Sequence, residues 1–205
     1  MTYALYSMQN SGNCYKPRLL MRQLGLDFRL VDTDSYDGST RTPEYLALNP
    51  NGKVPLLVLP DGRRLAESNA MLLHLAEGTP YLPEDRYQRA VCYQWLFFEQ
   101  YSHEPYIAVA RSWLHLMPGG RARMTPDRLA ELHARGYKAL DVMEQRLREA
   151  SWFAGDAYSV ADIALYAYTH VAEEGDFDLA PYPAIRDWLD RVAAVPGHID
   201  IDWRP

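Results

Sequence analysis

A group of side chains around the Lys53-Val54-Pro55 step could hold an extended peptide. A peptide laid beside the apolar run that begins at Pro55 could form main-chain hydrogen bonds to Val54, and Lys53 offers an ammonium group. Glu67 and Ser68 stand at the entry of a predicted helix, where unpaired N–H groups and the helix dipole favour a small carboxylate. A ligand carboxylate could therefore bind the N–H and hydroxyl of Ser68, and a ligand ammonium could bind Glu67.

The sequence also predicts the elements that would position this group. Leu56–Leu59 has the apolar, partly β-branched composition of a buried strand, and the Pro60-Asp61-Gly62 turn leads from it to a second strand. A helix at Asn69–Glu77 follows, and Gly78 is a natural stop. Upstream, the pattern indicates a strand, a helix and a strand, at Tyr3–Tyr6, at about Cys14 to Leu24 and at Phe28–Asp32. The predicted order is therefore βαβ followed by ββα.

The rest of the chain is predicted to be helical after a proline-containing linker. A long apolar and aromatic pattern covers Tyr87–Met117 and should bend near Pro105. Further helices are indicated by an N-cap at Thr125, by a capping box in outline at Ser159 and Asp162, and by amphipathic spacing over Pro183–Val195. Residues beyond Pro196 are predicted to be a surface tail.

Composition excludes several classes of function. Lys and Arg number 21 against 27 Asp and Glu, so the net charge of −6 disfavours nucleic acid as a partner. Two cysteines are too few for a disulfide framework, no secretion signal is recognisable, and no stretch is long and apolar enough to cross a membrane. We therefore expect a cytoplasmic protein without a membrane partner. The six histidines suggest no metal site, so no metal is expected.

The element order and the Lys53-Val54-Pro55 and Glu67-Ser68 motifs together resemble the cytosolic glutathione transferases, specifically bacterial members of the Ser type. The resemblance implies an α/β plus all-α fold: a thioredoxin-like glutathione-binding domain (1–78), a linker (79–86) and an all-helical domain (87–205). It also implies a homodimer that conjugates glutathione, as co-substrate, to small hydrophobic electrophiles in detoxification. In that family the peptide bond before the motif proline is usually cis.

The resemblance implies that a side chain must stabilise the glutathione thiolate. A free thiol has a pKa of about 8.5, and lowering it by about 2 units requires about 2.7 kcal/mol of preference for the anion. Ser11 is the first candidate because it precedes the first helix, whose N-terminus favours an anion. Asn13 could share this role, and Tyr6 competes for it. Cys14 could instead form a mixed disulfide with glutathione.

The tetrad Ser11-Gly12-Asn13-Cys14 looks like a Cys-x-x-Cys motif whose first cysteine is replaced by serine. No disulfide can close across such a tetrad, which argues against disulfide exchange within it. A Cys14-dependent glutathione thiol transferase or deglutathionylase therefore stays as an alternative function. A non-catalytic protein of the same shape, which binds a ligand or a partner, is a further alternative.

Other roles carry over from the family onto matching positions of this chain. Lys53 would pair with the glycyl carboxylate, Val54 with the cysteinyl main chain, and Glu67 and Ser68 with the γ-glutamyl end. Glu104 would reach the γ-glutamyl ammonium bound by the neighbouring subunit, with Glu99 nearly as plausible. The electrophile site is expected between the domains, and its candidate residues are Met8, His103, Tyr106, Arg111 and Trp113.

Overall fold

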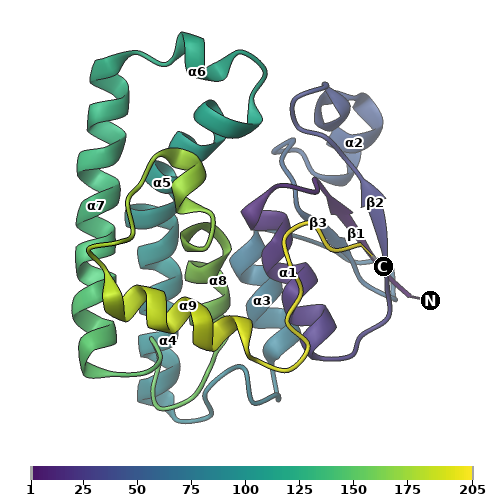
Figure 1. Cartoon of the computed structure of the whole chain (residues 1–205). Coiled ribbons are helices and arrows are strands. Elements are labelled where there is room, and N and C mark those ends of the chain that lie inside the picture. The colour runs from purple at the N-terminus through teal and green to yellow at the C-terminus, as the bar shows by residue number, and fades with distance from the viewer. Residues whose placement is uncertain (1, 205) are drawn as a thin grey trace. The chain divides into compact units, whose positions relative to one another are not determined.

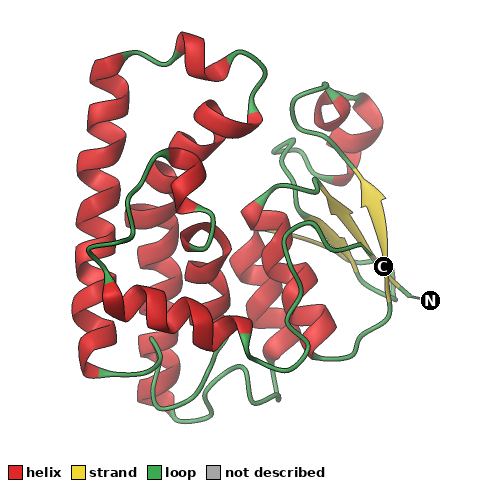
Figure 2. Cartoon of the chain, in the orientation of Figure 1, coloured by secondary structure: helices red, strands yellow, loops and turns green. Residues whose placement is uncertain are grey.

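The computed structural model describes residues 2–204, and the chain divides into two compact units (Figure 1). The first comprises Met1–Glu77 together with Pro196–Pro205, and the second comprises Gly78–Val195. All the strands among the described residues belong to the first unit, and the second is built of helices (Figure 2). The predicted fold class, a thioredoxin-like α/β part followed by an all-helical part, is therefore confirmed.

The first unit contains a four-stranded sheet in the order β2-β1-β3-β4. The strands are β1 (Tyr3–Ser7), β2 (Phe28–Asp32), β3 (Leu56–Val58) and β4 (Arg64–Ala66). β1 and β2 are parallel, as the intervening helix requires, whereas β3 runs antiparallel to β1 and β4 antiparallel to β3. This is the predicted βαβ-ββα order.

The helices of this unit are α1 (Gly12–Gln23), η1 (Ser39–Arg41), α2 (Pro43–Leu48) and α3 (Ser68–Ala76). α1 and α3 pack side by side, as Figure 1 shows, and α2 lies apart from them. Fully buried leucines from β1, α1, β3 and α3 form the core: Leu5, Leu19, Leu20, Leu57 and Leu72. α1 begins earlier than expected because the Ser11 hydroxyl oxygen accepts a hydrogen bond from the Cys14 N–H.

Residues 196–204, which we call the C-terminal strap, pack in the first unit and not in the helical one, although five of these nine residues are exposed at the surface. The Tyr15 hydroxyl donates to the carbonyl oxygen of Ile199 at 2.7 Å, in a buried position. The Arg18 guanidinium donates to the carbonyl oxygen of Ile201 at 3.0 Å, and Arg204 pairs with Asp32. The strap therefore satisfies buried donors of α1, which local sequence patterns do not reveal.

The second unit begins with α4 (Arg86–Phe98), α5 (Glu104–Arg111), the short α6 (Gly120–Arg123) and α7 (Pro126–Glu149), and continues with α8 (Val160–Thr169), η4 (Ala172–Gly175) and α9 (Pro183–Ala193). The predicted long helix is interrupted by π-helical turns at Glu99–His103 and Ser112–Leu116. The first turn ends just before Pro105, where the bend was predicted, and π-turns accommodate such breaks.

α8 is buried along its whole length, and its entry is held by Asp162. The Asp162 carboxylate accepts four hydrogen bonds, from the N–H and hydroxyl of Ser159, the N–H of Phe153 and the indole N–H of Trp188. The predicted capping box is confirmed, because the Ser159 side chain also accepts from the helix's first turn. Asp162 thus ties the helix entry to the preceding loop and to α9.

The Asp162 carboxyl should make stability depend on pH. Burial raises the pKa of Asp162 to about 6, against the opposing effect of its hydrogen bonds. The folded chain therefore binds this proton more tightly than the unfolded chain, in which aspartate titrates near about 3.9. The contribution is fully present below pH of about 4 and is lost as pH rises through about 6, lowering the free energy of unfolding by up to about 3 kcal/mol.

Urea unfolding of the wild type and of Asp162→Asn at a series of pH values checks this dependence. The asparagine variant does not titrate, so its stability should lack this particular decline between pH of about 4 and about 6. Equal declines in the two proteins would contradict the prediction.

Candidate functional site

The strand register gathers the predicted binding residues at one end of the sheet. Tyr6 of β1 faces Leu56 of β3, and Leu56 faces Ala66 of β4. Pro55 directly precedes Leu56, so it lies beside the end of β1 at Ser7 and beside the segment that follows β4, which starts at Glu67. The first of these segments leads to the N-terminus of α1, and the second is the start of α3. Sites far apart in the sequence are thereby brought to the same edge.

The Lys53-Val54-Pro55 segment is held by side chains on the α2 side. The Val54-Pro55 peptide bond is cis. The Tyr45 hydroxyl and the Asn49 amide donate to the carbonyl oxygen of Lys53 at 2.7 and 2.8 Å. Burial raises the pKa of Tyr45 to about 12. Within residues 2–204 the main chain of Val54 makes no hydrogen bond, so both its N–H and C=O can pair with an added peptide.

The start of α3 combines an exposed carboxylate with a buried hydroxyl. Glu67 precedes the helix with a φ of 66° and a ψ of 114°, a conformation that non-glycine residues seldom adopt. Such backbone strain costs about 1–3 kcal/mol and is concentrated at binding sites. Ser68, the first residue of α3, is buried, whereas the Glu67 side chain is exposed.

A polar cluster links the first turn of α1 to the first turn of α3. The Ser68 hydroxyl lies 3.1 Å from Asn13 Oδ1. Lys16 Nζ donates to Asn13 Oδ1 at 2.9 Å, to Asn69 Oδ1 at 3.3 Å and to Ser68 Oγ at 3.4 Å. Two of the predicted residues therefore meet, together with two that sequence reasoning missed. The available signal was that Asn13 and Lys16 lie three residues apart, which places them on the same helix face.

The predicted thiol-binding residues differ in their surroundings. Ser11 is half-buried at the N-cap of α1, where its oxygen accepts a hydrogen bond from the Cys14 N–H at 3.3 Å. Cys14 is fully buried, and its sulfur accepts from the Met8 N–H at 3.3 Å. Burial raises the pKa of the Cys14 thiol, so the reactive thiolate is disfavoured there. The Ser11 side chain also forms a hydrogen bond with the Cys14 thiol, which partly opposes the rise in the pKa of that thiol.

Tyr6, the competing candidate, is half-buried in β1. Its ring packs edge-to-face against Tyr45, with 5.8 Å between the ring centroids. Cys92 is also buried, and burial raises the pKa of its thiol to about 11, as expected for a core residue.

The structure gives the predicted electrophile-site residues of the second unit separate partners. His103 is fully buried against the Thr169 hydroxyl, with 2.9 Å between Nε2 and Oγ1. Arg111 is buried too, and its Nε pairs with Glu174 at 2.6 Å. Each of these contacts gives the residue a structural role within the second unit.

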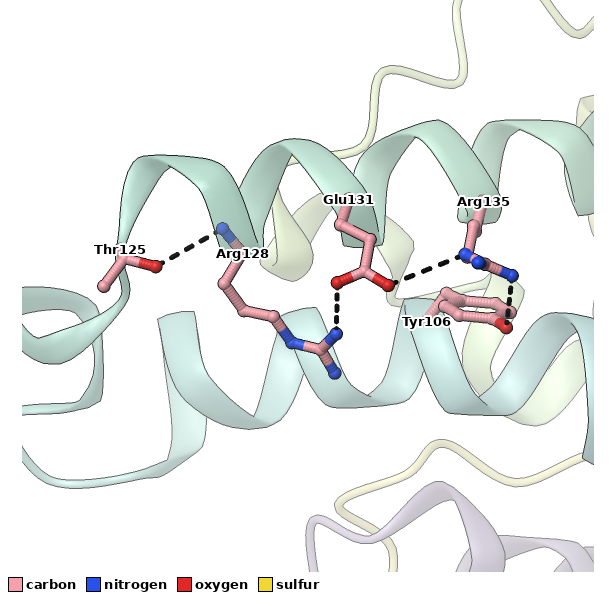
Figure 3. Close-up of polar contacts among 5 residues, drawn as sticks. All are labelled: Tyr106, Thr125, Arg128, Glu131 and Arg135. Atoms are coloured by element: carbon pink, nitrogen blue, oxygen red, sulfur yellow. Dashed lines mark hydrogen bonds and ion pairs between the residues drawn. The ribbon is translucent and has the colours of Figure 1, made fainter.

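Tyr106 and Trp113 each lie under an arginine. The Arg135 guanidinium lies over the Tyr106 ring, 5.5 Å from its centroid, and Figure 3 shows this contact beside the Arg128–Glu131–Arg135 ladder of α7. Arg123 lies over the Trp113 ring at 5.6 Å. A hollow of about 330 Å³ includes Tyr106 among its lining residues, with Phe98, Tyr101 and Val142 as its other large apolar members.

Of the two glutamates considered for a partner subunit, Glu104 is half-buried at the start of α5. Glu99 is fully buried and accepts a hydrogen bond from the Gln100 amide at 2.9 Å. Glu104 is therefore the more accessible of the two.

A second hollow, of about 290 Å³, lies where β1 and β2 end. Its lining includes the predicted residue Met8 together with Asp32, Asp34 and Arg204. Among residues 2–204 no three His, Cys, Asp or Glu side chains are grouped so that they could hold a metal ion. In the same part of the chain no helix is long and apolar enough to span a membrane.

Comparison with known proteins places both units in the same family. Residues 10–77 match the family described as "Glutathione S-transferase, N-terminal domain", and residues 110–196 match "Glutathione S-transferase, C-terminal domain". The chain is 31% identical over 191 residues to "Disulfide-bond oxidoreductase YfcG" of Escherichia coli, covering 90% of this chain and 87% of that protein. It is 33% identical over 205 residues to "Glutathione S-transferase 3" of Zea mays, covering 94% and 89%.

A solved structure from Rhodopseudomonas palustris, described as a possible glutathione S-transferase, has 50% sequence identity, a TM-score of 0.97 and full coverage of both chains. Sequence motifs, strand register and these likenesses agree. The chain belongs to the glutathione S-transferase family.

Proposed function

We propose that this chain is a glutathione transferase whose first unit binds glutathione and keeps its sulfur ionised. The observation that carries the proposal is the convergence of Val54, Ser68 and the N-terminus of α1 at one end of the sheet. The Val54 main chain pairs with the cysteinyl residue of glutathione. Ser68 receives the γ-glutamyl carboxylate and Glu67 the γ-glutamyl ammonium, while Lys53 pairs with the glycyl carboxylate.

In the proposed reaction the glutathione thiol releases its proton to solvent. The Ser11 hydroxyl then donates a hydrogen bond to the thiolate, and the N-terminus of α1 favours the negative charge. The sulfur attacks an electrophilic carbon, a carbon–sulfur bond forms, and the leaving group departs with the electron pair of its bond. Stabilising the anion is sufficient, so Ser11 need not act as a base.

Glutathione-dependent disulfide reduction is a second candidate, favoured by the name of the Escherichia coli relative. Here the bound glutathione thiolate attacks a disulfide, forms a mixed disulfide and releases one substrate thiolate. A second glutathione thiolate then attacks the glutathione sulfur of the mixed disulfide, which releases the other substrate thiolate and forms glutathione disulfide. Because Cys14 is buried with a raised pKa, the attacking sulfur in this scheme belongs to glutathione. Rates with a chloronitroaromatic and with hydroxyethyl disulfide as acceptors distinguish the two reactions.

The acceptor in the first reaction is a small hydrophobic electrophile, and the working form is a cytoplasmic homodimer. In the dimer Glu104 of one subunit reaches the γ-glutamyl ammonium bound by the other. Light scattering on the purified protein tests the dimer, and a monomer at assay concentration would remove the role of Glu104.

Calorimetric titration tests the binding part of the proposal. Ser68→Ala should weaken glutathione binding by about tenfold, because it removes a hydroxyl that bonds to a charged carboxylate. Ser151→Ala, which changes an exposed serine of the second unit, should bind like the wild type. Absence of binding by the wild type at millimolar glutathione would instead favour a non-catalytic protein of the same fold.

A further inference from the structure

The first unit buries the ammonium group of Lys16 next to Ser68, the residue that begins α3. Lys16 is 0% exposed, and its Nζ lies 3.4 Å from the Ser68 hydroxyl oxygen. Lys16 Nζ also donates to Asn13 Oδ1 at 2.9 Å and to Asn69 Oδ1 at 3.3 Å. A lysine is seldom fully buried unless its charge is used or compensated.

We propose that Lys16 is a positioning residue of the glutathione site that selects ligands carrying the γ-glutamyl α-carboxylate. The inference rests on the proposed function, because it concerns the carboxylate that Ser68 is proposed to bind. A carboxylate oxygen that accepts from the Ser68 hydroxyl lies within about 6 Å of Lys16 Nζ, since such a hydrogen bond adds about 2.7 Å. Two unit charges at that separation attract each other, and burial limits screening by salt.

The N-terminus of α3 acts in the same direction. Its unpaired N–H groups carry partial positive charge toward the same carboxylate. The charge of the Lys16 ammonium and the dipole of α3 therefore both attract the ligand carboxylate.

Lys16 also fixes the amide of Asn13. Asn13 Oδ1 lies within hydrogen-bond distance of both the ammonium of Lys16 and the hydroxyl of Ser68, so the amide nitrogen must lie on the opposite side of the group. When the Ser68 hydroxyl turns to a bound carboxylate, the bond from Lys16 keeps the Asn13 oxygen satisfied. One ammonium thus supports both the serine and the asparagine.

The same helix provides a matched control. Arg18 is likewise 0% exposed, but its guanidinium donates to the carbonyl oxygens of Gln9, at 2.6 Å, and Ile201, at 3.0 Å. Arg18→Met and Lys16→Met each remove a buried cation from α1. Lys16→Met alone removes the cation that contacts Ser68.

The experiment compares glutathione with 4-aminobutyryl-cysteinylglycine, which lacks only the α-carboxylate of the γ-glutamyl residue. Calorimetric dissociation constants are measured for the wild type, Lys16→Met and Arg18→Met. We expect Lys16→Met to reduce the preference for glutathione over the analogue by about tenfold, and Arg18→Met to leave that preference unchanged. Equal weakening of both ligands by Lys16→Met would overturn the proposal, because it would reveal a merely structural role.

If Lys16→Met does not fold, an NMR measurement on the wild type tests the proposal instead. The chain has three lysines, Lys16, Lys53 and Lys138, so lysine labelled with ¹³C and ¹⁵N gives few NMR signals, which Lys53→Arg and Lys138→Arg assign. The Lys16 signals should shift with glutathione and much less with the analogue. Equal shifts would overturn the proposal. Failure of the wild type to bind either tripeptide would remove the proposed function itself, an outcome distinct from equal weakening.

Discussion

Ser11→Ala is expected to lower kcat/KM for conjugation of glutathione to a chloronitroaromatic acceptor by about 100-fold. The hydroxyl is the donor that we propose for the thiolate, and removing one such donor from an anion site commonly has an effect of this size. Ser11 also caps α1, so we expect a loss of about 1 kcal/mol of stability as well. The rate should be measured against pH, because loss of the donor should move the apparent pKa of bound glutathione toward that of free glutathione.

Conservative variants separate the thiol donor from the neighbouring candidates. Ser11→Thr keeps a hydroxyl and should retain most of the activity. Tyr6→Phe keeps the ring contact with Tyr45 and removes only the hydroxyl, so it should have little effect. Cys14→Ala should likewise remain active, because the thiol is buried. Full activity of Ser11→Ala combined with inactivity of Tyr6→Phe would assign the role to Tyr6 instead.

Asp162→Ala is expected to lower the free energy of unfolding by about 3–5 kcal/mol. The substitution removes the acceptor of the buried N–H groups of Phe153, Ser159 and Trp188, and each unsatisfied buried donor costs about 1–3 kcal/mol. It also removes the capping box of a helix that is buried along its whole length. Since a folded domain is stable by only about 5–15 kcal/mol, poor recovery of folded protein is expected at higher temperature.

Urea unfolding at neutral pH measures this loss. Asp156→Ala is the matched control, because Asp156 is an exposed aspartate in the loop before α8. A change below about 1 kcal/mol in Asp162→Ala would show that water or rearrangement satisfies the donors, and the structural role assigned to the carboxylate would be wrong.

Much of the first unit could be predicted because its signals are local. The Pro60-Asp61-Gly62 turn and the apolar strands have compositions that favour one local structure, whereas the cis bond at Val54-Pro55 was implied by the family resemblance. The capping box at Ser159 is local in the same sense. Pairing of β1 with β3 is not local, but few other arrangements of a βαβ-ββα pattern bury these strands.

The unpredicted features depend on contacts between distant residues. A lysine on a helix is usually solvated, and the approach of α3 to α1 gives Lys16 the oxygens of Ser68 and Asn69 as further partners. The strap has no strong periodicity, because it is held mainly through its main-chain carbonyls. His103 and Arg111 have the residue types of a binding site, yet Thr169 and Glu174 are their partners in the fold.

The C-terminal strap has a consequence for synthesis on the ribosome. Its residues leave the exit tunnel after those of every helix described here, although the other residues of its unit precede the helical unit in the sequence. Until then the nascent chain lacks the Ile199 and Ile201 carbonyls that accept from Tyr15 and Arg18. The first unit can therefore form all of these hydrogen bonds only after residues 196–204 have been translated, later than every helix of the second unit.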